Sequence, residues 1–148
     1  MTSHTIQAHS LTKYSIAITS ATSLLHSARR LASEMGIEVA LAITDAGGHL
    51  KAFEATDGVP FLATDVAIDK AWTAVSFGMP THVWGDLFTT RPDLAQLAHR
   101  PRLVAVGGGY PIIENGHVIG GLGVSGGSAV DDQKIAIETL TTAGFQLP

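Results

Sequence analysis

The sequence predicts an α+β domain in which helices flank a five-stranded, mostly antiparallel sheet. Hairpin signals lie on both sides of a central helical segment, and hairpins join antiparallel neighbours rather than the parallel strands of a doubly wound fold. Nine of the 16 glycines lie between Val104 and Ala136 among β-branched residues. Such glycines predict strands that are bulged, tightly turned or closely approached by another backbone or a ligand. The length of 148 residues predicts a single domain, 1–148.

The first predicted elements are a long helix and a hairpin. Apolar residues recur at helical spacing over residues 11–35, where Ser10 is placed to cap the helix and Gly36 to end it. Residues 39–44 are almost all apolar and predict a buried strand. The turn sequence DAGG follows, and residues 49–54 alternate in polarity as a strand that pairs back.

The central segment is predicted to be helical. A helix is expected over residues 61–77, after an Asp-Gly turn and before Gly78. Residues 83–98 also have helical periodicity, but Pro92 interrupts them, so we expect two short helices there.

The last part of the chain is predicted to supply three strands and a helix. The strands are expected at residues 103–106, 111–114 and 117–125, with the sequence ENG forming a hairpin turn between the last two. Ser128 is expected to cap a final helix that runs through Thr142.

Composition limits the partners of the protein. Hydrophobic residues make up 45% of the chain and charged residues only 15%. A charged surface this sparse predicts a homo-oligomer with an apolar interface; the alternative is a small core rich in Ala and Gly. A net charge of −4 with nine Lys and Arg residues lacks the basic stripe that nucleic-acid binding needs. Because the chain has no cysteine, disulfides and thiolate metal sites are excluded.

The sequence also bears on location. No apolar run approaches the roughly 20 residues that a membrane span needs, so we expect no membrane partner. The N-terminal sequence MTSHTIQAHS lacks the apolar region of a signal peptide, which predicts a cytoplasmic protein. Residues 1–9 precede the first predicted helix, and we expect them to be flexible.

Lys70 is a candidate catalytic residue because it falls at the centre of an apolar helical stripe. Burial there would lower its pKa and suit it to proton transfer, Schiff-base chemistry or anion binding. The alternative is an ion pair with Asp45, Asp57 or Glu54 that fastens the helix to the sheet. The stripe consists of Ala63, Val66, Ala67, Ala74 and Phe77.

Two further features are candidate binding sites. The run Gly107, Gly108 and Gly109 follows a predicted strand, and successive glycine N–H groups can cradle an oxyanion, carboxylate or phosphate; a bulged connection is the alternative. His82 comes directly after the Lys70 helix, beside Trp84, and is a candidate for acid–base work or for ligation.

Three segments together carry a family resemblance: AITDAGGHL, DGVPFLATDVAIDKAWTAVSFGMP and GGGYPIIENGHVIGGLGVSGGSAVDDQKIA. They resemble the GlcG/HbpS-like haem-degrading domain family over about residues 11–145. The same family supplies the C-terminal domain of some PduO-type adenosyltransferases. The resemblance implies an α+β fold with a profilin-like layout, assembly into homo-oligomers and, in some members, haem binding. Other members are encoded among genes for glycolate or aromatic-compound metabolism.

The resemblance adds polar candidates and a functional hypothesis. Asp45, Asp57 and Ser125 match the family pattern and are candidate ligand-binding residues. If haem is the ligand, His82 is the candidate axial ligand of its iron, and Lys70 or Arg91 could meet a propionate. The bulky sequence THVW after the Lys70 helix departs from the family pattern and suggests a specialised pocket.

Three functions follow as hypotheses. The first is a small-molecule-binding protein with haem as the leading ligand. The second is a cofactor-independent tautomerase, isomerase or hydrolase for a small carboxylated metabolite, such as an aromatic ring-cleavage product, with proton transfer by Lys70 or His82 and the glycine run holding an oxyanion. The third is a structural assembly module.

Overall fold

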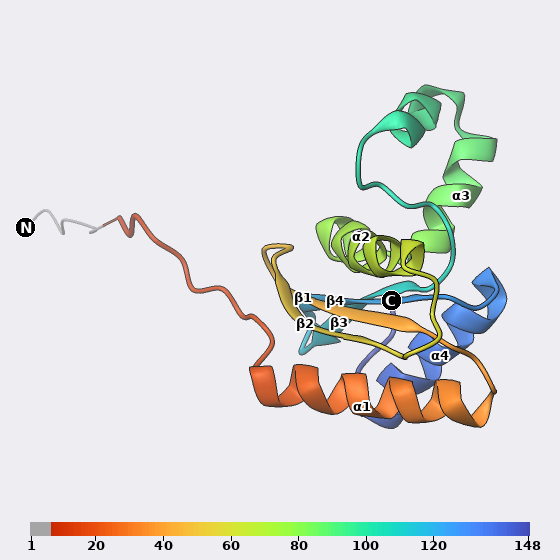
Figure 1. Ribbon diagram of the computed structural model, residues 1–148. Helices are drawn as coiled ribbons and strands as arrows, with labels where there is room; N and C mark the ends of the chain where they lie inside the picture. Colours follow the sequence, from red (N-terminus) through yellow and green to blue (C-terminus); the bar gives the residue numbers. More distant parts are fainter. Residues whose placement is uncertain (1–6) are drawn as a thin grey trace, which may run out of the picture.

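In the computed structural model, which describes residues 7–148, an antiparallel sheet lies between two layers of helices (Figure 1). The sheet has four strands in the order β2-β1-β4-β3. Helices α1 and α4 cover one face, and α2 covers the other (Figure 1). In chain order the elements are α1 (Ile18–Glu34), β1 (Ala40–Asp45), β2 (Leu50–Ala55), α2 (Leu62–Phe77), α3 (Thr81–Thr90), the 3₁₀ helix η1 (Pro92–His99), β3 (Gly109–Glu114), β4 (His117–Ser125) and α4 (Ala129–Thr142).

The α+β class and the antiparallel sheet are confirmed, but the prediction of a fifth strand at residues 103–106 is wrong. Threonine side chains take the backbone groups that a strand would pair. Thr73 Oγ1 accepts a hydrogen bond from the N–H of Val104 (3.1 Å), and Thr81 Oγ1 donates one to the carbonyl of Val106 (2.6 Å). Because these side chains bond backbone groups that would otherwise pair with a neighbouring strand, residues 103–106 form part of the loop between η1 and β3.

The first helix starts later than predicted, at Ile18 instead of about residue 11. The preceding segment is extended because Ile16 anchors it to the sheet. The Ile16 side chain is 2% exposed, and its N–H donates to the carbonyl of Ile119 at 2.9 Å. Ser10 therefore caps no helix. At the other end Gly36 has a φ of +70°, as expected for a glycine that ends a helix. The expected flexibility of residues 1–9 falls mostly outside the described residues.

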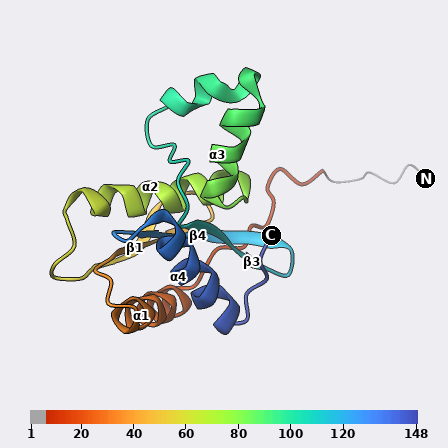
Figure 2. The ribbon, with the colours of Figure 1, turned by 90° about the vertical axis from the view of Figure 1, so that its right-hand side faces the viewer.

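Other predicted boundaries agree with the structure. Ser128 Oγ accepts a hydrogen bond from the N–H of Asp131 (3.1 Å) and caps α4. Pro92 separates α3 from η1, which together form an arm that projects from the body (Figures 1 and 2). The two helices of this arm pack mainly against each other. Within the described part of the chain, no helix has the length and apolar character needed to cross a membrane.

The glycines of β4 allow α2 to lie directly on the sheet. A Cβ on Gly123 would overlap the carbonyl oxygen of Ala67, and one on Gly121 would overlap that of Ala71. The facing side of α2 is correspondingly small: Ala63, Ala67, Ala71 and Ala74 are all buried. The close approach predicted from the glycine-rich stretch is therefore made by a helix of the same chain.

Candidate functional site

Lys70 is buried at the junction of α2, β4 and α4. Its side chain is 2% exposed. Its Nζ donates a hydrogen bond to the carbonyl of Val124 (2.9 Å) and another to Asp132 Oδ2 (3.2 Å). The other oxygen of Asp132 accepts a hydrogen bond from the N–H of Gly127 (2.9 Å). One buried ion pair thus fastens α2 and α4 to the end of β4.

The partners expected for Lys70, namely Asp45, Asp57 or Glu54, are wrong, because Asp132 holds that position. The sequence contained a signal for it. Asp132 precedes the buried residues Ile135, Ala136 and Thr139 at helical spacing, which places its carboxylate on the buried face of α4. Asp132 also lies in the first turn of α4, where a negative charge complements the helix dipole.

Burial opposes the charges of this pair. It lowers the pKa of Lys70, although the attraction of Asp132 acts in the opposite direction. It also raises the pKa of Asp132, against the attraction of Lys70 and the hydrogen bond from Gly127. The two charges are therefore tolerated because they are paired, and removing either one would leave the other buried without compensation.

The glycine run covers the Lys70 ammonium group. A Cβ on Gly108 would lie 2.8 Å from Lys70 Nζ. The N–H of Gly109 donates to Thr81 Oγ1 (2.9 Å), and the carbonyl of Gly108 accepts from the N–H of Val124 (2.9 Å). Gly107 is buried as well. The Gly109 N–H is a donor that an oxyanion-binding nest would have to present, and all three glycines are buried, so the nest stays a prediction.

The other two candidates on the strands and turns, Ser125 and Asp45, lie at opposite ends of the sheet. Ser125 is buried at the Lys70 end of β4 and pairs with Ala40. Asp45 is at the opposite end of β1. Although burial acts to raise its pKa, hydrogen bonds from the N–H groups of His49 and Gly47 hold the pKa of Asp45 below its ordinary value. Asp45 therefore stabilises the turn between β1 and β2.

Two charged candidates are on the surface. Asp57 is exposed after β2. Arg91 follows α3 on the arm, where its guanidinium group forms a two-pronged ion pair with Asp93 at 3.0 and 2.8 Å. Neither side chain reaches the Lys70 cluster.

Among the candidate residues, His82 is the one whose surroundings are least explained by a structural role. It is half-buried near the start of α3, at the base of the arm. Its Nδ1 is buried and has no hydrogen-bond partner in the described part of the chain. The ring centroid lies 6.1 Å from that of Tyr110. An unpaired imidazole nitrogen in apolar surroundings can ligate a metal or exchange a proton.

Aromatic side chains surround the base of the arm. Trp84 is 3% exposed, and its ring packs edge-on against Phe77 at 5.0 Å and tilted against Phe88 at 5.7 Å. The Trp84 Nε1 donor is also buried without a partner among the described residues. His82 and this aromatic cluster form the candidate functional site. The sequence identified His82 but gave no sign of the buried Trp84 donor.

Comparison with known proteins places the chain in a family. A family model described as "Haem degrading protein HbpS-like" matches residues 16–141. A 15.0 kDa Citrobacter freundii protein from the dhaT-dhaS intergenic region is 32% identical over 123 residues, which cover 82% of this chain and 87% of that protein.

Two further relatives connect the chain to PduO. The corrinoid adenosyltransferase PduO of Salmonella typhimurium is 34% identical over 115 residues, which cover 76% of this chain but only 34% of PduO. The crystal structure of a PduOC–haem complex superposes with a TM-score of 0.82 at 27% identity and covers 90% of this chain and 98% of that one. The chain belongs to the HbpS-like family and is related to GlcG and to the C-terminal domain of PduO.

Proposed function

We propose that this protein binds a small molecule, with haem as the leading ligand and His82 as its contact. The observation that carries the proposal is the His82 imidazole, whose Nδ1 is buried without a partner among the described residues. A PduOC relative, 27% identical, was crystallised with haem. Haem iron takes a histidine nitrogen as an axial ligand and needs apolar surroundings for its ring.

The residues at the base of the arm fit this group in their chemistry. His82 offers the axial nitrogen, and Phe77, which is 65% exposed and packs edge-on against Trp84, offers an apolar ring at the base of the arm. A haem propionate would need a cation, and Lys70 is buried and paired with Asp132. Arg91, whose ion pair with Asp93 is on the surface, is the remaining candidate for that contact. Arg91 lies nine positions after His82, just past the end of α3, which is roughly 13–14 Å at the α-helical rise.

The enzymatic alternative has less support. Proton transfer by Lys70 would need access to a substrate, and the Lys70 side chain is 2% exposed beneath Gly108. The N–H of Gly109, which would stabilise an oxyanion, already donates to Thr81. His82 is half-buried and is therefore the more accessible candidate of this pair.

Titration with hemin tests the proposed ligand. We expect a shift of the Soret band at micromolar hemin for the original protein. His82→Ala should weaken binding roughly tenfold or more, since losing the iron–nitrogen bond removes more than about 1.4 kcal/mol. His49→Ala is the matched control, because that imidazole is exposed and bonded to Asp45. No Soret shift, or an equal shift in His82→Ala, would contradict the proposal.

We also propose that the protein forms a homo-oligomer through its exposed apolar side chains. Phe61 is 92% exposed, Leu62 68% and Val130 77%. Large apolar side chains exposed to this extent are typical of a surface that another subunit covers. Light scattering should give a multiple of the 15.4 kDa chain mass, and Phe61→Ser/Leu62→Ser should shift it toward the monomer. Thr141→Ala is the control, because Thr141 is exposed on α4, and it should leave the mass unchanged. A 15.4 kDa particle at every concentration would contradict this proposal.

A further inference from the structure

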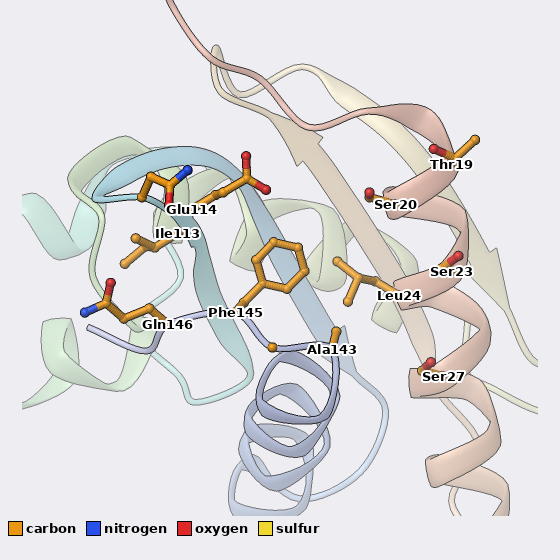
Figure 3. A pocket seen from close by; sticks show the side chains of 12 residues that line it. Thr19, Ser20, Ser23, Leu24, Ser27, Ile113, Glu114, Ala143, Phe145 and Gln146 are labelled. Atoms are coloured by element: carbon orange, nitrogen blue, oxygen red, sulfur yellow. The ribbon is translucent and has the colours of Figure 1, made fainter.

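A groove on the side of the sheet opposite α2 has no role in the proposed haem site. It lies between α1, the β3–β4 hairpin and the segment that follows α4 (Figure 3), and its volume is about 700 Å³. This falls within the roughly 300–1,000 Å³ typical of small-molecule sites.

One wall of the groove consists of hydroxyl groups. Ser20, Ser23 and Ser27 recur at helical spacing and line the groove from α1. Serine is a weaker helix former than alanine or leucine, so this concentration of serines adds little to the stability of α1. Each hydroxyl can both donate and accept a hydrogen bond. Such a wall suits a ligand that also carries several hydroxyl groups.

The floor of the groove is apolar. Figure 3 shows the ring of Phe145 between Leu24 of α1 and Ile113 of β3. Leu24 is buried and Phe145 half-buried, so the exposed part of the ring is held on a packed base. An aromatic face of this kind packs against the C–H face of a saturated ring.

The backbone fixes the segment that carries Phe145. Gly144 has a φ of +87°, which turns the chain at the end of α4. The N–H of Phe145 then donates to the carbonyl of Leu140 at 3.0 Å, and Gln146 pairs with Ile113 in an isolated antiparallel bridge. The groove is thus formed before any ligand arrives, which reduces the entropy lost on binding.

The charge of the groove selects against anions. Glu114 is the one charged side chain among the described residues that line it, and the remaining polar groups are hydroxyls and the amides of Asn115 and Gln146. A carboxylate on the ligand would meet Glu114 without a cation to balance it. For the same reason the propionates of haem would find no partner here.

We propose that this groove, with its serine wall, Phe145 floor and single carboxylate, binds a neutral polyhydroxylated molecule with an apolar ring face, of the sugar class. The proposal is independent of the haem site. Its affinity would be weak, in the millimolar range typical of a small ligand held by a few hydrogen bonds.

Nuclear magnetic resonance can test this with a matched pair of probes. Methyl α-D-glucoside is expected to shift the amide signals of Ser23, Asn115 and Gly144 in a saturable manner. D-Glucuronate, which carries a carboxylate on a similar ring, should bind at least several-fold more weakly because of Glu114. Ser23→Ala should weaken glucoside binding roughly fivefold, as expected for one hydrogen bond.

Two more variants separate ligand contact from folding. Phe145→Leu keeps an apolar side chain and should weaken glucoside binding, whereas Thr22→Ala, on the same helix but outside the groove, should not. The proposal is overturned if the glucoside causes no saturable shift near Ser23, if glucuronate binds as tightly, or if Ser23→Ala and Phe145→Leu bind like the original protein. Binding of n-octanol without binding of the glucoside would also overturn it, because the groove would then be a purely apolar site.

Discussion

Lys70→Met is expected to lower the free energy of unfolding by roughly 3–5 kcal/mol, because it strands a buried carboxylate. Methionine fills the space of the lysine stem but cannot donate to Asp132 Oδ2 or to the carbonyl of Val124. Urea denaturation monitored by circular dichroism would measure the loss. Lys134→Met is the control, since Lys134 is exposed on α4 and its replacement should change stability by less than about 0.5 kcal/mol.

A double variant identifies the cause of that loss. Lys70→Met/Asp132→Asn removes both charges, while the asparagine amide oxygen can still accept from the N–H of Gly127. We expect the double variant to be more stable than the sum of the two single losses predicts. If Lys70→Met keeps full stability and loses ligand binding instead, Lys70 belongs to the binding site and not to the scaffold.

Gly123→Ala is expected to destabilise the protein by about 3 kcal/mol or more, or to prevent folding. The added methyl group would overlap the carbonyl oxygen of Ala67 and lie 2.8 Å from the backbone nitrogen of Ala71. Both are backbone atoms of α2, so no change of side-chain rotamer relieves the overlap and the helix must move off the sheet.

Gly58→Ala is the matched control for Gly123→Ala. A methyl group on Gly58 would meet only the Glu38 side chain, at 3.1 Å, which can rotate away. Its effect should stay within about 1 kcal/mol in thermal or urea melts. Equal stability of Gly123→Ala and Gly58→Ala would contradict the direct packing of α2 on β4.

The sequence predicted those parts of the fold that depend on local signals. The Pro92 break and the Ser128 cap follow from properties of single residues, and both are present. The errors arose from distant contacts. Thr73 of α2 bonds the backbone of the segment that was predicted as a fifth strand, and Ile16 holds the residues before α1 in an extended form against Ile119.

The same distinction applies to the candidate site. The helical wheel correctly placed Lys70 on the buried face of α2, but its partner Asp132 is 62 residues away and could not be chosen from spacing alone. The glycine density predicted close backbone approach without identifying α2 as the approaching element. For His82 the sequence gave a candidate, and the structure adds a ring nitrogen that has no partner within residues 7–148; its role as a ligand stays a prediction.

The central claim is that a small molecule meets His82, while Lys70 and the glycines of β4 belong to the scaffold. Soret absorbance during hemin titration of His82→Ala and of Lys70→Met/Asp132→Asn tests it most directly. We expect that His82→Ala, although folded like the original protein, loses most of the Soret shift, and that the folded Lys70→Met/Asp132→Asn retains it. An intact shift in His82→Ala, or the loss of the shift in folded Lys70→Met/Asp132→Asn, would contradict the claim.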